Sequence, residues 1–227
     1  MMPLAFACGK EHPLRVLCLG AHSDDIEIGC GGTLIRLIDS FPDCIVLWII
    51  LSANTTRAAE ARKSTELYLA SIHYKEVLIE NFRDGFFPYN GGKLKEYFEK
   101  LKLRMNPDII FTHNRNDLHQ DHRLVADLTW NTFRDHFIME YEILKYDGDI
   151  GTPNVFIPLT PSICEKKIKW LQECFKSQAD NIWFEEDCFK AMMRIRCIEA
   201  NSSSRYVEAF YCRKAIFAFE GSLNASS

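Results

Sequence analysis

The sequence lacks an apolar stretch long enough to cross a membrane. Its longest apolar run covers residues 44–51, whereas a membrane-spanning helix needs roughly 20 such residues. The first ten residues also lack the positively charged start and the continuous apolar segment of a secretory signal. These two absences predict a chain without a transmembrane segment and without export.

Positive charge is also scarce relative to negative charge. The 27 Lys and Arg residues are outnumbered by 31 Asp and Glu residues, which gives a net charge of −4. The chain therefore has no electrostatic footprint for a nucleic-acid partner. Its nine cysteines are odd in number and never spaced as CxxC, and without a secretory signal we expect them to be reduced. We therefore predict a cytoplasmic protein.

Short apolar runs alternate with helical segments over the first 135 residues. The runs are rich in apolar and β-branched residues, as buried parallel strands are. The expected strands cover residues 14–20, 44–51, 76–79 and 108–112, and the expected helices cover residues 33–40, 57–72, 93–104 and 124–134. This alternation predicts an α/β fold with a mostly parallel sheet and helices on both of its faces.

The remaining third is less regular. Residues 141–160 carry loop signals, among them Asp147-Gly148-Asp149 and two prolines. Beyond them we expect helices at 164–177 and 187–194, a strand near 207–213, and a frayed tail at 220–227. The sequence shows no internal repeat and no low-complexity linker, so a single domain is expected.

Two polar clusters follow the first and fourth expected strands. His22, Asp24 and Asp25 come directly after the first strand, and the segment from His119 to His122 comes soon after the fourth. In open parallel sheets, ligands bind at the carboxyl ends of the strands, so both clusters should emerge on one rim. Either cluster alone could be a helix cap or a surface loop. Together they offer the nitrogen and oxygen ligands of a catalytic zinc site, with a carboxylate beside it to accept a proton.

The two clusters also resemble the motifs of a known family. The segment AHSDDIEIGCGGT is similar to the AHPDDxEIGxGGT signature of the PIG-L/LmbE-like deacetylases, and HQDHR is similar to their HPDH motif. The resemblance covers at least residues 14–125. It implies a Rossmann-like α/β domain that uses Zn²⁺ to hydrolyse N-acetyl groups on glucosamine-containing molecules.

The resemblance assigns roles to eight residues. It makes His22, Asp25 and His122 the metal ligands and Asp24 the general base that takes a proton from the attacking water. It makes His119 the group that stabilises the oxyanion or protonates the leaving amine, with Asp121 holding His119 in orientation. It also suggests that Arg57 and Asp84 contact sugar hydroxyls.

The match is not complete, because Ser23 and Gln120 stand where the family has proline. Both prolines would stiffen a loop rather than react, so we expect altered loop stability and retained chemistry. Within a single domain at 1–227, the resemblance implies a metal-binding core at about 14–135 and a C-terminal part that completes the pocket.

The sequence is compatible with several functions and residue roles. The leading one is a zinc-dependent deacetylase acting on a small N-acetyl sugar conjugate; a zinc amidase for a non-sugar amide and a non-catalytic sugar-binding homologue are the alternatives. His113 either borders the pocket or is structural, and Asp149 either contacts substrate or belongs to a turn. Gly29, Gly31 and Gly32 are expected to allow a tight turn and close helix packing rather than to bind a dinucleotide. Self-association into a homo-oligomer is also left open.

Overall fold

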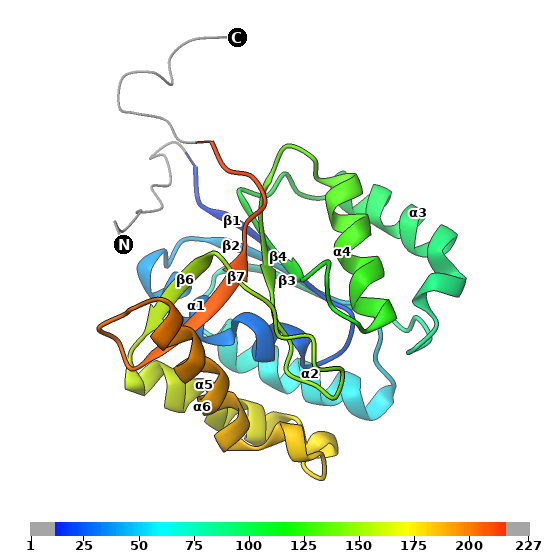
Figure 1. The fold of residues 1–227 in the computed structure, drawn as a ribbon. Coiled ribbons are helices and arrows are strands. Elements are labelled where there is room, and N and C mark those ends of the chain that lie inside the picture. Colours follow the sequence, from blue (N-terminus) through cyan, green and yellow to red (C-terminus); the bar gives the residue numbers. More distant parts are fainter. Residues whose placement is uncertain (1–11, 217–227) are drawn as a thin grey trace.

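Seven strands form one sheet at the centre of the computed structural model, which describes residues 12–216 (Figure 1). The strands are β1 (Arg15–Gly20), β2 (Ile45–Ile50), β3 (Tyr74–Ile79), β4 (Ile109–His113), β5 (Phe137–Tyr141), β6 (Val155–Leu159) and β7 (Tyr206–Tyr211). Their order across the sheet is β3-β2-β1-β4-β5-β7-β6. The first five positions are joined by parallel pairs, and β7 runs antiparallel to both of its neighbours.

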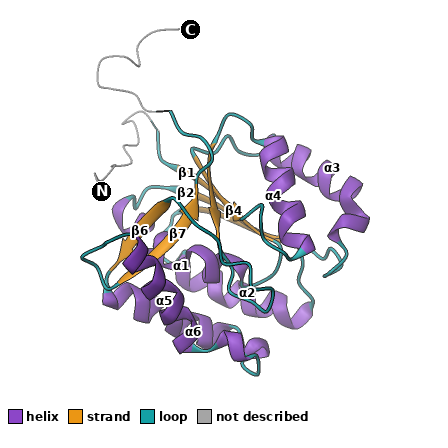
Figure 2. Cartoon of the chain, viewed as in Figure 1, coloured by secondary structure: helices purple, strands orange, loops and turns teal. Residues whose placement is uncertain are grey.

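Helices cover both faces of this sheet (Figure 2). They are α1 (Asp25–Ser40), α2 (Thr55–Tyr68), α3 (Gly91–Lys102), α4 (Gln120–Thr132), α5 (Pro161–Cys174) and α6 (Glu186–Glu199), with short 3₁₀ turns η1 (Phe87–Asn90), η2 (Lys176–Gln178) and η3 (Ile182–Phe184). The α/β class, the mostly parallel sheet and the two-sided helix layers predicted from the sequence are therefore confirmed. None of the helices in the described part of the chain is long and apolar enough to cross a membrane.

Alternate residues of each central strand pack into two separate hydrophobic cores, one on each face of the sheet. In β1, Val16 and Cys18 belong to the core shared with α1, α2, α5 and α6. Leu17 and Leu19 belong to the core shared with α3 and α4. Successive side chains of a strand point to opposite faces, so a strand buried on both sides must be apolar at every position. The near-continuous apolar runs in the sequence have this origin.

Helix α1 begins eight residues earlier than expected from the sequence. We expected a loop before Thr33, but the helix starts at Asp25 and contains Gly29, Gly31 and Gly32. A β-carbon at Gly29 would lie 2.2 Å from the Tyr141 ring. The predicted close packing at these glycines is confirmed. The predicted tight turn is wrong, because the three glycines lie inside the helix.

The same helix is interrupted at Cys30, whose backbone is not helical. The interruption leaves the N–H groups of Gly32 and Thr33 without helical partners, and the Glu208 carboxylate of β7 accepts both of them, at 2.9 and 2.6 Å. Lys167 of α5 donates to Glu208 and to the carbonyl oxygen of Ile28. A buried ion pair from the last third of the chain therefore closes the gap in the helix that carries Asp25.

Strands β5 and β6 were not expected from the sequence: no element was assigned to residues 137–140, and residues 141–160 carried loop signals. The expected tail at 220–227 lies outside the described residues. The other expected elements are present, with ends that differ by a few residues from the sequence-based bounds.

Candidate metal centre

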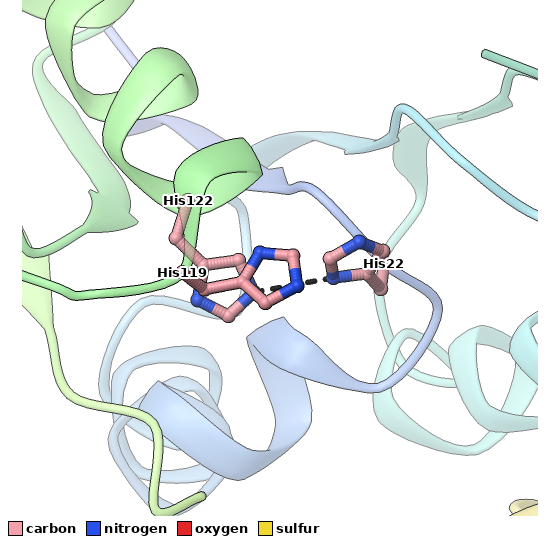
Figure 3. A group of neighbouring side chains, drawn as sticks. All are labelled: His22, His119 and His122. Atoms are coloured by element: carbon pink, nitrogen blue, oxygen red, sulfur yellow. Dashed lines mark hydrogen bonds between the residues drawn. The ribbon is translucent and has the colours of Figure 1, made fainter. Parts of the chain in front are cut away.

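The two polar clusters meet at the carboxyl ends of β1 and β4. These strands pair directly in parallel, so the segments that leave them emerge side by side. Asp24 is the N-cap of α1, and His119 is the N-cap of α4. Figure 3 shows His22, His119 and His122 gathered at this edge, with the ring nitrogens of His22 and His122 facing each other. The sequence-based expectation that the clusters share one rim is confirmed.

His22, Asp25 and His122 lie close together, and they take part in the three groups of described residues that could hold a metal ion: His22, His119 and His122; Asp25, His113 and His122; and His22, Asp84 and Asp121. The Nδ1 atom of His22 lies 3.1 Å from Nε2 of His122. The Asp25 carboxylate oxygens lie 3.4 Å from the His22 nitrogen and 3.6 Å from the His122 nitrogen. Ligands held at bonds of about 2.0–2.1 Å around a tetrahedral zinc ion lie about 3.3 Å apart. The three side chains therefore have the spacing that one such ion requires.

The charges around His22 also favour a cation. Its Nε2 atom lies 3.0 Å from Asp84 and 3.4 Å from Asp121, in addition to the contact with Asp25. Burial lowers the pKa of His22, but the Asp25 charge and hydrogen bonds to these carboxylates raise it well above its ordinary value. A positive charge at this position is thus strongly stabilised.

Asp117 orients the imidazole of His122. Its Oδ2 atom lies 2.9 Å from His122 Nδ1, which leaves Nε2 as the nitrogen that faces His22 and Asp25. Its Oδ1 atom accepts from the backbone N–H of His119 at 2.7 Å. Burial raises the pKa of Asp117, but the hydrogen bond to His122 and the charges of His122, His113 and Lys145 lower it to about 2. Asp117 therefore stays ionised and holds both histidines of the HQDHR segment, a role that the sequence reasoning did not assign.

Lys145 and Asp149 support Asp117 from the loop after β5. Lys145 Nζ lies 3.0 Å from Asp117 Oδ1 and also donates to Asp149. Asp149 in turn accepts from the backbone N–H of Leu118 at 2.7 Å. The Asp149 carboxylate therefore fixes the loop that carries His119.

His113 is a structural histidine. It is fully buried, and its Nε2 atom accepts from the backbone N–H of Ala21 at 2.9 Å. Its ring stacks on His122 with centroids 3.9 Å apart. Although Nε2 also lies 3.2 Å from Asp25, its lone pair is occupied by Ala21, so His113 is poorly placed to bind an ion. It fixes the end of β1 and the plane of His122 instead.

Asp24 lies beside this centre in an ion pair with Arg57. The Arg57 guanidinium donates to Oδ1 of Asp24, and Oδ2 is buried with no hydrogen-bond partner among the described residues. Burial raises the pKa of Asp24, and the charge of Arg57 opposes that rise without cancelling it. The result is a carboxylate with one free oxygen and an increased affinity for a proton.

His119 presents its ring to the same space. Its Nδ1 atom accepts from the backbone N–H of Asp121 at 3.3 Å, which leaves Nε2 without a partner in the N-cap interaction. The ring lies edge-on to His22, with centroids 5.0 Å apart. Burial and the charge of His22 lower the pKa of His119, so its neutral form is favoured.

Asp121 contacts a different loop from the one expected. Its carboxylate accepts from the backbone N–H groups of Gly85 and Phe87, at 2.7 and 3.1 Å, and it is fully buried. The contact between Asp121 and His119 runs through the backbone N–H rather than through the carboxylate. The Asp121 side chain therefore fixes the loop that carries Asp84, whose own side chain is 75% exposed.

An open cleft of about 950 Å³ runs over the metal centre. Its lining includes the residues assigned from the family resemblance, side chains at the start of α2, and part of the segment between α5 and α6. Among the side chains that line it are His22, Asp24, Asp25, Asn54, Thr56, Arg57, Asp84, His119, His122, Lys145, Ser177, Gln178 and Trp183. The cleft therefore brings together seven of the eight predicted site residues, and Asp121 lies buried behind it.

Comparison with known proteins gives one family and a set of structural neighbours. Residues 17–133 match the family model PIG-L, described as GlcNAc-PI de-N-acetylase. No curated protein sequence matches the chain.

Three solved structures illustrate the structural likeness. An N,N'-diacetylchitobiose deacetylase from Pyrococcus horikoshii is 22% identical, with a TM-score of 0.64 over 87% of this chain and 83% of that chain. The zinc-inhibited form of the teicoplanin deacetylase Orf2 is 13% identical, with a TM-score of 0.68 over 87% and 97%. GalB from Pseudomonas putida, a 4-carboxy-2-hydroxymuconate hydratase, is 15% identical, with a TM-score of 0.68 over 91% and 98%. At these identities the likeness shows the fold alone, and the fold hosts more than one reaction.

Proposed function

The chain belongs to the PIG-L (GlcNAc-PI de-N-acetylase) family, and from that premise we propose that it is a zinc-dependent hydrolase that removes the acetyl group from an N-acetylated amino sugar or its conjugate. The single observation that carries the proposal is the spacing of 3.1–3.6 Å among His22, Asp25 and His122. Two imidazoles and one carboxylate are a typical ligand set for catalytic zinc, which keeps a further position open.

A zinc ion held there would polarise the acetyl carbonyl and make water more acidic. The protein's own groups would do the rest. Asp24 has the free oxygen Oδ2 facing no other donor, and it is the group we assign to take the proton from the attacking water. Its partner oxygen is fixed by Arg57, so the free one keeps its orientation.

His119 is assigned to the other side of the reaction. Its Nε2–H, which the N-cap interaction leaves free, can donate a hydrogen bond to the oxygen of the scissile carbonyl. The water oxygen bonds to the acetyl carbon, the C–N bond breaks, and the proton that Asp24 took from the water passes to the departing nitrogen. The products are acetate and a free amino sugar.

Arg57 and Asp84 are the proposed sugar contacts. Both line the cleft, and Asp84 is exposed enough to accept hydrogen bonds from hydroxyl groups. Arg57 has a second task in holding Asp24, so its removal would affect catalysis as well as binding.

Of the two positions that differ from the family motif, Gln120 contacts a loop and the buried Ser23 hydroxyl has no hydrogen-bond partner among the described residues. Gln120, in place of proline, donates from its amide to the carbonyl oxygen of Gly85. Ser23 is buried. Both residues leave the ligands and Asp24 in place, which is consistent with an active enzyme.

The experiment is an amine-release assay on the zinc-loaded protein. The panel contains N-acetylglucosamine, its glycosides, and acetamides that lack a sugar, with acetate measured in parallel. We expect equal release of amine and acetate from the sugar compounds. Release from the sugar-free acetamides alone would favour an amidase, and zinc binding without release from any compound would favour a non-catalytic homologue.

A further inference from the structure

The cleft extends beyond the metal centre along the start of α2. Its volume of about 950 Å³ lies near the upper end of the range of about 300–1,000 Å³ for ligand pockets. Its far wall is formed by Ser177, Gln178 and Trp183, which come from η2 and η3. All three residues lie outside the region that matches the family model.

The Trp183 ring is partly covered by the protein, so only part of it can contact a ligand in the cleft. It is half-buried and packs against the larger hydrophobic core. Its ring meets the Phe184 ring edge-on, with centroids 5.6 Å apart, and Phe184 is itself buried. One part of the indole therefore packs on the hydrophobic core, and another part lines the cleft.

The wall that carries Trp183 is fastened to α2. Ser177 donates from its backbone N–H and from its hydroxyl to the Glu60 carboxylate, both at 2.7 Å. Asn181 donates to the amide oxygen of Gln178 at 3.1 Å. Glu60 lies three residues after Arg57, less than one helical turn away. The position of the indole is thus set relative to the proposed sugar contact Arg57.

The side chains near this wall are neutral and polar. Asn54 and Thr56 at the start of α2, together with Gln178, offer amide and hydroxyl groups to the cleft. Arg57, the cation of this region, is paired with Asp24. An aromatic face bordered by amides and hydroxyls suits a carbohydrate ring, whose C–H face packs on the indole while its hydroxyl groups find hydrogen-bond partners. Of the other cations that line the cleft, Arg83 lies over the Phe86 ring and Lys145 is paired with Asp117 and Asp149.

We propose that Trp183 forms the platform of a second sugar subsite, so that the substrate carries another carbohydrate ring next to the N-acetylated one. This inference rests on the proposed function for the position of the first ring. On this proposal, Trp183 in the last third of the chain contacts the ring next to the reacting sugar and so determines which substrates bind.

The test compares a one-ring and a two-ring substrate on the zinc-loaded protein. The one-ring probe is the methyl β-glycoside of N-acetylglucosamine, and the two-ring probe is the β-1,4-linked dimer of N-acetylglucosamine. We expect Trp183→Ala to lower kcat/KM for the two-ring probe about tenfold, through KM, with kcat unchanged. For the one-ring probe the change should stay within twofold, and Trp183→Phe should recover most of the loss.

Trp170→Phe is the matched control. Trp170 packs on Tyr68, with centroids 4.8 Å apart, away from the residues that line the cleft. It should leave both probes unaffected. An equal loss for the two probes in Trp183→Ala, or no loss for either, would overturn the subsite.

A binding measurement separates this inference from the proposed function. Trp183 alone among the four tryptophans of the sequence lines this cleft, so the two-ring probe should change tryptophan fluorescence in the Asp24→Asn variant and not in Asp24→Asn/Trp183→Phe. If neither probe is deacetylated but this signal persists, the subsite stands and the proposed reaction fails. If the two-ring probe gives no signal and no preference in rate, the subsite is wrong.

Discussion

Residues 14–135 and the residues that follow them contribute to the same cleft in different ways. The first region places His22 and Asp24 between β1 and α1 and His122 in the first turn of α4, with His22 Nδ1 3.1 Å from His122 Nε2. Among its described residues the second region contributes no member of a candidate metal-binding group, but it supplies Lys145 beside Asp117 and Trp183 in the lining of the cleft. The candidate site residues are thus concentrated in the first region, and the second region adds contacts around them.

The two regions are joined at the broken helix α1. Glu208 and Lys167 close the gap beside Cys30, and Tyr141 packs against Gly29 where a β-carbon would not fit. A difference in role between the regions therefore does not mean independence in folding. Substitutions in the two regions should show whether activity, metal binding and stability can be changed independently of one another.

The largest effect should come from Asp24→Asn. Loss of a positioned general base costs about 10²- to 10⁴-fold in rate, so kcat should fall by that factor while zinc content, measured by atomic absorption, stays at the wild-type level. Asp39→Asn, on an exposed position of the same helix, should leave both quantities unchanged. A kcat within tenfold of wild type for Asp24→Asn would remove Asp24 from the mechanism.

Glu208→Gln should produce the next largest effect, on stability rather than on rate. Breaking one partner of a buried ion pair costs about 3–5 kcal/mol, and here one of the N–H groups of Gly32 and Thr33 loses its acceptor as well, because the amide replaces one carboxylate oxygen by a donor. Urea unfolding should show this loss, whereas Glu173→Gln, in an exposed pair with Lys169, should change stability by less than about 0.5 kcal/mol. A cost below about 1 kcal/mol for Glu208→Gln would mean that the C-terminal region does not support α1.

Asp117→Asn should weaken zinc binding without unfolding the protein. Outer partners of metal-bound histidines typically contribute 10- to 100-fold in affinity, and Asp117 is the carboxylate that orients His122. Competition with a chromophoric chelator would measure the change, with Asp127→Asn on the exposed face of α4 as control. Wild-type affinity in the Asp117 variant would show that His122 needs no such partner.

Gln120→Pro should have the smallest effect. Gln120 is the first residue of α4, where proline is well accommodated, and His119 before it has the extended backbone that proline prefers. A gain of about 0.4–1 kcal/mol from a stiffer unfolded chain is offset by the lost bond to Gly85. Thermal unfolding should therefore give a net change within about 1 kcal/mol, and a larger loss would show that the Gly85 contact has been underestimated.

Much of the fold was predictable because strands buried on two sides leave continuous apolar runs. The strands that were missed lack this signal. β5 contains Glu140, which is fully buried and paired with Arg213. β6 contains Pro158 and pairs only with β7 at the edge of the sheet, a place where proline is tolerated. Arg213 and β7 lie far along the chain from these strands, so the local sequence pattern does not reveal them as partners.

The meeting of the two metal-site clusters was also predictable, since it follows from the ends of parallel strands. The support for that site was not. Asp117 was visible in the sequence but had no assigned role, because its contact with His122 depends on how α4 begins. Lys145 and Trp183 reach the cleft from segments far along the chain, and no local pattern connects them to the histidines.

The most direct test of the central claim is a zinc titration of the metal-stripped protein, followed by acetate release from an N-acetylated glucosamine conjugate. Activity should rise to a plateau at one zinc ion per chain, and His122→Ala should bind no zinc at that concentration and remain inactive. Full activity without metal, or undiminished activity of zinc-treated His122→Ala, would contradict the account.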